Sequence, residues 1–475
     1  MANILWIVNK YLGKEKEDEF FPYFLTHTQK ELVKEGHQLS FCFFSDSLAN
    51  NKHLNNKFVY KDDYHQLSSK EIESEASRIE KKYEFTFKQA YFADIVQTFK
   101  GQNHRKITVP EKDFSDLSFL VTRFLFLEKV ILANNIDVIF SDVSPEAEME
   151  FGRVIGYKLN KIVLKSSEGS ALGKTVLLRS FKFGKDQLVE APINNYTNDE
   201  AEVFCKDFIK NQRVPYSRPK RNIVSKTLSS RINDRIKKKD FLYFLIWPFK
   251  IIKGSLLSLY YLIERRVFKP ILYDTYNPNV PYLFIGFHLN QESTMVLRAQ
   301  PYTNQTILVE MLSRVLPHNH TLYVRAHPHW PDRYTFKYLS TLKKFPGVKL
   351  ISERISIHEI IKNSKAILTY NATTGIEALI YNKPVLSFAS NIYKEHPAVS
   401  YCSDLFDLGE KLSKLVNTTV DNNDTISFIT KINSCSIDFL LGSSFFISEM
   451  DSIQKAEVFS DFLHEAIVWC SDNKN

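Results

Sequence analysis

The stretch that decides the fold is Ala366-Ile-Leu-Thr-Tyr370-Asn-Ala-Thr-Thr-Gly375-Ile-Glu-Ala-Leu-Ile380-Tyr-Asn-Lys-Pro-Val385-Leu-Ser-Phe388. It holds two short apolar runs, Ala366–Tyr370 and Val385–Phe388, which have the length of buried strands. Between them, Gly375–Tyr381 has the apolar composition of a packed helix. A helix between two buried strands forms a βαβ unit, which predicts that the strands lie parallel in one sheet.

The same alternation extends upstream to Tyr282 and downstream to Val416. The further predicted strands are Leu283–Phe287, Leu322–Val324 and Val348–Ile351. The further predicted helices cover about Thr303–Val315, Tyr334–Lys344, Ile357–Lys362 and Leu405–Val416. Short strands separated by helices predict a doubly wound parallel sheet.

A second α/β unit is predicted at the start of the chain. Its strands are Ile4–Val8, Leu39–Phe44, Val138–Phe140 and Ile162–Leu164, and its helices are Phe21–Glu35, Leu117–Asn134 and Pro145–Leu159. The charged residues 51–113 receive no assignment. The predicted fold class is therefore α/β, with two Rossmann-type domains whose parallel sheets face a cleft. We divide the chain into a first α/β domain (1–195), a basic amphipathic segment (196–275), a second α/β domain (276–420) and C-terminal helices (421–475).

The composition is that of an ordinary globular protein, with 475 residues, 44% hydrophobic and 24% charged. Five cysteines are spaced singly, which argues against a zinc site and a disulfide framework and favours a reducing compartment. The first ten residues have no basic region before their apolar run, so they are interpreted as a strand and not as a signal peptide.

The net charge of +8 is concentrated in one segment. Between Arg213 and Lys269 there are fifteen Lys and Arg against three acids, a local balance of +12, so the other residues together carry −4. This pattern favours an anionic partner, either a membrane or a nucleic acid. Within it, the apolar run Phe241–Ile263 contains Lys250 and Lys253, and a central Lys costs about 2.5–3.5 kcal/mol to insert. A helix lying in the membrane interface is expected, and an amphipathic helix packed between the domains stays the alternative.

Polar side chains follow three strands of the second domain. His288, Gln291 and Glu292 follow the first strand, Arg325 and His327 the second, and the turn from Asn371 to Glu377 the fourth. Because ligands bind beyond the carboxyl ends of such strands, we expect these residues to converge.

The turn from Asn371 to Gly375 presents hydroxyls and backbone N–H groups at a helix N-terminus, which suits a phosphate. Thr374-x-x-Glu377 also fits a capping box, as does Ser356-x-x-Glu359. The absence of GxGxxG and Walker A sequences argues against nicotinamide and P-loop chemistry.

Two strand-end residues have chemistry that suits the same ligand. His327 precedes a proline, which holds it extended, and it can donate to a phosphate oxygen together with Arg325. Glu292 could serve as a base, a nucleophile or an ion-pair partner.

From about Tyr282 to Val416 the sequence resembles the capsule and surface-polysaccharide biosynthesis proteins that include the bacterial Kdo transferases, which are glycosyltransferases of the GT-B type. The matching motifs are His288…Glu292, Arg325-Ala326-His327-Pro328, and Asn371…Ala378 followed by Lys383-Pro384-Val385. The chain departs from many relatives at Asn290-Gln291, where they have Gln-Pro, and at Ala326, where they have an acid.

The resemblance implies donor binding in the second domain, acceptor binding in the first, and chemistry in the cleft. It implies phosphate contacts from His327 and Arg325, helix-terminal donors from the Thr373 turn, and a ribose contact from Glu377. The implied catalytic residues are Glu292 and His327, and the implied donor-binding residues are His288, Gln291, Arg325, Asn371, Thr373, Thr374, Gly375 and Glu377. Neither domain has an Asp-x-Asp strand end, so a metal-independent reaction without a cofactor is expected.

The predicted function is that of a glycosyltransferase moving a sugar from a nucleotide-sugar donor, with CMP-linked sugars among the candidates. Its expected acceptor is a surface glycan or lipid-linked molecule of capsule or lipopolysaccharide synthesis, and its expected place is cytoplasmic, peripheral at the inner face of the cell membrane. The alternatives are a teichoic-acid-type polyol-phosphate transferase with a CDP donor and a nucleotide-sugar epimerase of the same fold. A nucleic-acid binder would leave the strand-end residues unexplained, so no nucleic-acid partner is expected.

Overall fold

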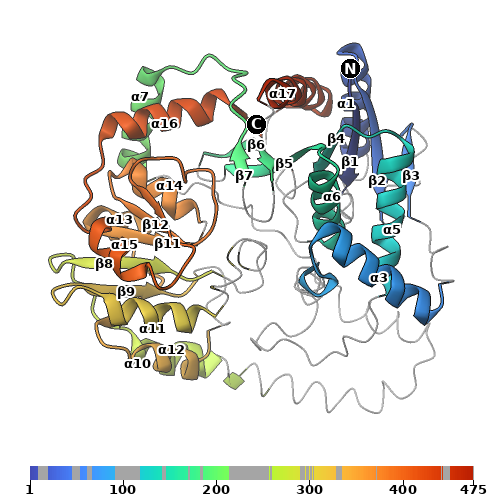
Figure 1. Cartoon of the computed structure of the whole chain (residues 1–475). Helices are drawn as coiled ribbons and strands as arrows, with labels where there is room; N and C mark the ends of the chain where they lie inside the picture. Colours follow the sequence, from blue (N-terminus) through green and yellow to red (C-terminus); the bar gives the residue numbers. More distant parts are fainter. Residues whose placement is uncertain are drawn as a thin grey trace.

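The computed structural model describes residues 1–8, 20–44, 54–60, 67–90, 118–141, 146–169, 172–181, 186–212, 256, 259–260, 262–288, 295, 299, 302, 304–327, 334–370, 372–439, 441 and 450–473. Within these residues the chain forms two α/β units, each built on its own sheet (Figure 1). The predicted α/β fold class with two Rossmann-type units is confirmed. The cleft between the sheets stays a prediction, as do the boundaries of the four parts of the chain.

The first sheet has the strand order β14-β6-β5-β4-β1-β2-β3, with β7 paired to β6. The strands that pair in parallel are β1 (Asn3–Val8), β2 (Gln38–Phe43), β3 (Lys57–Val59), β4 (Val138–Ser141) and β5 (Ile162–Gly169). An antiparallel extension follows, formed by β6 (Lys174–Ser180), β7 (Asp186–Leu188) and β14 (Ser436–Ile437). The sequence did not predict β3 or this extension.

Helices cover both faces of the first sheet, and β1 shows why. Ile4, Trp6 and Val8 pack into one hydrophobic core, whereas Leu5 and Ile7 pack into another on the opposite face. The first core is closed by α1 (Phe20–Lys34) and α17 (Ser452–Asp472), which lie side by side although they come from opposite ends of the chain (Figure 1). The second is closed by α3 (Ser69–Tyr83), α5 (Ser118–Ala133) and α6 (Ala147–Lys158).

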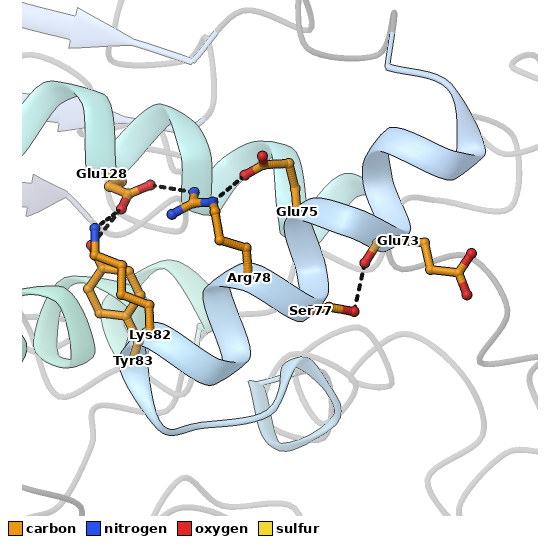
Figure 2. Close-up of polar contacts among 7 residues, drawn as sticks. All are labelled: Glu73, Glu75, Ser77, Arg78, Lys82, Tyr83 and Glu128. Carbon is orange, nitrogen blue, oxygen red and sulfur yellow. Dashed lines mark hydrogen bonds and ion pairs between the residues drawn. The ribbon is translucent and has the colours of Figure 1, made fainter.

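Helix α3 lies in the region that the sequence left unassigned, and a buried carboxylate attaches it to α5. Glu128 of α5 accepts hydrogen bonds from Arg78 Nη2 at 3.0 Å, Lys82 Nζ at 2.8 Å and Tyr83 OH at 2.6 Å (Figure 2). Burial favours the neutral acid, but these three donors outweigh it and hold the pKa of Glu128 below its ordinary value. Glu128 therefore stays ionised and acts as the anchor of α3.

The second sheet has the order β10-β9-β8-β11-β12-β13, and all its pairs are parallel. Its strands are β8 (Tyr282–Gly286), β9 (Thr321–Arg325), β10 (Val348–Leu350), β11 (Ala366–Thr369), β12 (Val385–Ser387) and β13 (Val399–Tyr401). The connecting helices are α11 (Gln305–Val315), α12 (Phe336–Leu342), α13 (Ile357–Asn363), α14 (Thr373–Ile380) and α15 (Leu408–Leu415). The five predicted strands are present, and β13 is an addition.

The two units share a hydrophobic core and several polar contacts. Side chains of β6, of α7 (Asn198–Asn211), of α14 and of α16 (Asn422–Ser434) belong to the same buried cluster. Lys394 Nζ of the second unit donates to the backbone oxygen of Asp186 in β7, and Lys431 pairs with Glu190. The second unit is therefore packed directly against the antiparallel extension of the first sheet.

Most of the basic segment Arg213–Lys269 lies outside the described residues, including the greater part of the apolar run Phe241–Ile263. Its last residues form a π-helical turn, Glu264–Phe268, which continues into α10 (Lys269–Leu272). Among the residues that the structure describes, no helix combines the length and apolar character needed to span a bilayer.

Candidate functional site

The second sheet reverses its strand order between β8 and β11. Chain order runs outward from β8 through β9 to β10 on one side, and from β11 through β12 to β13 on the other. The crossover connections leave in opposite directions at this point, and the carboxyl ends of strands at such a switch point are where Rossmann-type folds hold ligands. The candidate site is this edge.

The residue that follows β8 by two positions, His288, is held by its backbone. Its N–H donates to Gln305 Oε1 at 3.0 Å, and its carbonyl accepts from Gln305 Nε2 at 2.7 Å and from Tyr334 OH at 2.8 Å. The half-buried imidazole lies edge-on to the Tyr370 ring, which follows β11, with ring centroids 5.6 Å apart. His288 is thus fixed across the switch point.

Arg325 ends β9 and is 9% exposed. Its Nη1 donates to the carbonyl of Ile355 at 3.0 Å, and its guanidinium lies 5.5 Å from the centre of the Phe284 ring. Its Nε has no hydrogen-bond partner among the described residues. Burial lowers the pKa of Arg325 to about 10, with Glu377 and Glu353 acting in the opposite direction. The cation therefore keeps bonding capacity to spare at the strand edge.

The turn after β11 is fixed from two sides. Ala372 N–H donates to Thr369 Oγ1 at 3.0 Å, and Ala372 O accepts from Tyr393 OH at 3.1 Å. Gly375 lets the Tyr393 ring come close, because a Cβ at this position would lie 2.4 Å from its Cζ atom. Helix α14 begins at Thr373, so its first N–H groups point toward the edge of the sheet.

Glu377 of α14 is 3% exposed, and its Oε2 has no hydrogen-bond partner among the described residues. Burial raises the pKa of Glu377 to about 7, although the Thr373 hydroxyl and the Arg325 charge both lower it. A carboxyl with such a pKa can donate or accept a hydrogen bond near neutral pH. Glu377 and Arg325 thus place a buried carboxyl and a buried cation at one edge of the sheet.

The capping boxes expected at Thr374-x-x-Glu377 and Ser356-x-x-Glu359 are wrong. The N-cap of α14 is Ala372, so Thr374 lies inside the helix and Glu377 points into the protein. Ser356 is the N-cap of α13, but its hydroxyl makes no capping bond to any described residue. The first turn of α14 therefore receives no side-chain cap. The Gly375 N–H donates to the Ala372 carbonyl at 3.0 Å, which leaves the N–H groups of Thr373 and Thr374 for a ligand.

The sequence-predicted residues fall into two groups. The described ones, namely His288, Arg325, His327, Thr373, Thr374, Gly375 and Glu377, lie at the carboxyl edge of β8, β9 and β11. His327 is half-buried, two residues beyond the end of β9. Gln291, Glu292 and Asn371 lie outside the described residues, so their catalytic and binding roles stay predictions.

Sequence reasoning missed three residues that shape this edge. Gln305 and Tyr334 hold the His288 backbone, and the buried Tyr370 packs against its ring. The hydroxyl of Tyr370 finds no partner in the described part of the chain, and burial raises its pKa well above the ordinary value. Tyr370 could have been found from the sequence, since it is the last residue of the fourth predicted strand, Ala366–Tyr370.

The first sheet has a comparable edge that sequence reasoning also missed. Its order reverses between β1 and β4, and the helix after β4 carries the buried Glu148. Glu148 Oε1 accepts from Arg123 Nη1 of α5 at 2.5 Å. Burial and the nearby Glu148 charge both raise the pKa of Cys42, a residue of β2. Glu148 therefore lies near the end of β2. The strand-end rule used for the second domain would have identified Glu148 if it had been applied to Val138–Phe140.

The chemistry of the donor set is that of hydrogen-bond donors and cations around one buried carboxyl. In the described part of the chain no three His, Cys, Asp or Glu side chains gather as they would around a metal ion. The edge of the second sheet thus presents N–H groups, a guanidinium and imidazoles, which suit a phosphate, and a carboxyl, which suits a hydroxyl group.

Residues 233–399 match the model of a family described as capsule polysaccharide biosynthesis protein. This region, about a third of the chain, is therefore similar to the capsule polysaccharide biosynthesis family. The resemblance predicted from the strand-end motifs is thereby confirmed. The matched region covers β8 to β12 and also begins well upstream of them, inside the basic segment. Among curated proteins none matches the chain.

Solved structures with related folds share little sequence with this chain. The β-Kdo 2,4 transferase of KpsC from Thermosulfurimonas dismutans is 11% identical, with 63% of this chain and 80% of that chain covered and a TM-score of 0.35. The UDP-GlcNAc 2-epimerase from Methanocaldococcus jannaschii is 12% identical, with 91% and 99% covered and a TM-score of 0.27. HepE of Anabaena, solved with UDP and glucose, is 11% identical, with 98% and 99% covered and a TM-score of 0.25. TM-scores this low carry no argument about chemistry.

Proposed function

We propose that this chain is a glycosyltransferase of the capsule polysaccharide biosynthesis family that binds a nucleotide-sugar donor at the carboxyl edge of its second sheet. The observation that carries the proposal is the Glu377 carboxyl, which is 3% exposed and has an oxygen without a hydrogen-bond partner among the described residues. Such a buried group is costly unless a ligand completes its bonding. It lies beside Arg325 and the first turn of α14, at the switch point of the sheet.

The donor would engage two kinds of group at this edge. The N–H groups of Thr373 and Thr374 suit a phosphate oxygen, and Arg325 and His327 add donors from the end of β9. Glu377 suits a ribose hydroxyl, since a carboxyl with a pKa of about 7 can donate or accept. His288 forms the wall of the site at the end of β8, where its backbone is fixed by Gln305 and Tyr334.

The catalytic roles belong to the same proposal. Glu292 would act as the catalytic carboxylate, with His327 beside the leaving phosphate, and Gln291 and Asn371 would add donor contacts. Charge on the departing nucleotide would be balanced by Arg325 and the α14 N–H groups, so the proposed reaction is metal-independent. Replacing Glu292 by Gln should reduce turnover about 100-fold while donor binding persists.

The acceptor and the place of action complete the proposal. The acceptor would be a surface glycan or a lipid-linked molecule of capsule or lipopolysaccharide synthesis. The protein would be peripheral at the inner face of the cell membrane. It would be held there by the basic segment, which contains fifteen Lys and Arg and three acids.

Thermal shift with CMP, CDP, UDP, GDP and their sugars tests donor binding. A ligand that binds only the folded chain raises the melting temperature as its concentration rises. We expect one nucleotide and its sugar to do so with wild type but much less with Glu377→Gln, and the exposed Glu359→Gln on α13 serves as the control. The proposal fails if no nucleotide stabilises the wild type, or if Glu377→Gln responds as the wild type does. A response to CDP-glycerol alone would favour the polyol-phosphate alternative.

A further inference from the structure

The described residues that lead into the second sheet, 256, 259, 260 and 262–272, are helical and expose a stripe of apolar side chains. Leu256, Tyr260, Ile263, Val267 and Ile271 are each between 40% and 70% exposed. They are spaced three or four residues apart, so on a helix they share one side. Leu259 and Leu262 are also more than 40% exposed and widen this stripe. A single exposed apolar residue is ordinary, but a continuous set indicates a contact surface.

The opposite side of these residues is packed and polar. Glu264 is 2% exposed and accepts a hydrogen bond from the Phe336 N–H at the start of α12. The rings of Phe268 and Phe336 lie 6.1 Å apart. The carbonyl of Leu272 accepts from Lys343 Nζ at 2.9 Å, near the end of α12. These contacts fix the rotation of the segment, so the apolar stripe cannot turn inward without exposing the buried Glu264 carboxylate.

Charge indicates what covers the stripe. Arg266 is exposed and lies in the chain between Ile263 and Val267, and the segment that ends here carries a balance of +12. Basic side chains beside aliphatic and aromatic ones are the composition of a helix that lies in the surface of an anionic bilayer. A second copy of the chain is a poorer partner, because a two-fold interface through this stripe would bring the same cations together.

We propose that the stripe formed by Leu256, Tyr260, Ile263, Val267 and Ile271 docks on an anionic lipid surface, with the helix lying in the plane of the membrane. The proposal names the residues and the face for the membrane location, and it holds whatever nucleotide the donor site takes.

The docked helix would also orient the donor edge. Helix α12 contacts the docking helix at Phe336, and Tyr334, two residues earlier, donates to the His288 carbonyl at 2.8 Å. One packed helix therefore separates the lipid-facing stripe from the end of β8. The edge of the second sheet would then stand at a fixed height above the lipid surface.

Flotation of the full-length protein with lipid vesicles tests the proposal. The variant is Ile263→Gln with Val267→Gln, which keeps the helix and its basic residues but removes two apolar contacts. The matched control is Val203→Gln with Ile307→Gln, two similarly exposed aliphatic residues on α7 and α11. On phosphatidylcholine vesicles that contain phosphatidylglycerol, the stripe variant should bind about ten-fold more weakly than wild type, and the control should bind as wild type does.

Three outcomes would overturn the proposal. They are equal binding by stripe variant and control, equal wild-type binding to vesicles without phosphatidylglycerol, and a wild-type dimer in sedimentation that the stripe variant alone dissociates. Nucleotide thermal shifts of the stripe variant should match those of wild type. If no nucleotide stabilised the wild type, the proposed function would fail, but the flotation result would still test the membrane surface separately.

Discussion

Each unit has a buried carboxyl on the helix that follows its fourth strand, and the two carboxyls differ in their contact with a cation. The order β3-β2-β1-β4-β5 of the first sheet repeats in β10-β9-β8-β11-β12 of the second, and the helix after the fourth strand carries Glu148 in one and Glu377 in the other. Glu148 is 2.5 Å from Arg123 Nη1. Glu377 interacts with the Thr373 hydroxyl and, at longer range, with the charge of Arg325, whose Nη1 is bonded to the Ile355 carbonyl.

The difference separates a structural carboxylate from one available to a ligand. Where the cation is in direct contact, the pair ties α5 to α6, although Glu148 Oε2 has no hydrogen-bond partner among the described residues, as is true of Glu377 Oε2. Where the cation bonds elsewhere, burial dominates and raises the pKa of Glu377 to about 7. A shared strand order is therefore not enough to locate a binding site, because direct contact with a cation differs between the two buried carboxyls.

The largest expected effect is the loss of stability when the Glu148–Arg123 pair is broken. Glu148→Gln leaves the Arg123 charge without its partner, and breaking a buried pair on one side costs about 3–5 kcal/mol of unfolding free energy. Urea unfolding measures this loss. The control is Glu410→Gln, whose pair with Lys414 lies on the surface and should leave the unfolding midpoint unchanged. Equal behaviour of the two variants would contradict a structural role for Glu148.

The second effect is a pH dependence that belongs to Glu377. Its pKa in the fold is about 7, above the value near 4.3 of an unfolded Glu, so between these pH values the native state holds the extra proton. The unfolding free energy should therefore fall by about 3 kcal/mol as the pH rises through this window, and stay level above it. In Glu377→Gln this part of the slope should be absent. The unfolding free energies of wild type and Glu377→Gln are measured at about pH 5 and pH 8. An equal change with pH in the two proteins would contradict the raised pKa of Glu377.

A smaller effect is expected for the cation of the second sheet. Arg325→Met replaces a buried guanidinium by an apolar chain of similar length, so the fold should tolerate it. Affinity for the stabilising nucleotide should fall about 10- to 100-fold, because one or two charge-assisted hydrogen bonds to the nucleotide would be lost. Calorimetric titration measures it, with the exposed Arg314→Met on α11 as the control. Unchanged affinity would remove Arg325 from the donor site.

The smallest effect concerns the close approach at α14. Gly375→Ala brings a Cβ against the Tyr393 ring and should cost about 1–2 kcal/mol of stability, since a rigid ring cannot yield as an aliphatic tip does. Gly409→Ala in α15 is the control, because its Cβ would make only ordinary contacts from 3.5 Å outward. Melting temperatures of the two variants decide, and a Gly375→Ala protein as stable as the control would show that the turn can move.

The sequence could predict the parallel strands because apolar runs and helical stretches alternate with clear spacing. It could not predict β14, a strand of two residues, or α17 on α1, because these depend on contacts between distant parts of the chain. The carboxyl edge with His288, Arg325 and Glu377 was predicted from strand ends alone. The capping box was wrong, because Thr369 and Tyr393 fix Ala372 and make it the N-cap, which no local pattern reveals.

The packing of α17 on α1 has a consequence for synthesis. Trp6 of β1 lies 5.3 Å from Phe459, ring centre to ring centre, so an early strand is covered by a helix that follows all the strands of both sheets in the sequence. At 5–20 residues per second, roughly tens of seconds separate their appearance from the ribosome. By the end of this interval the second sheet has all its strands, whereas the first still has one hydrophobic face uncovered. The first sheet is therefore covered later than the strands of the second sheet are made, and a ribosome-bound chain lacking α17 should depend on a chaperone to shield that face.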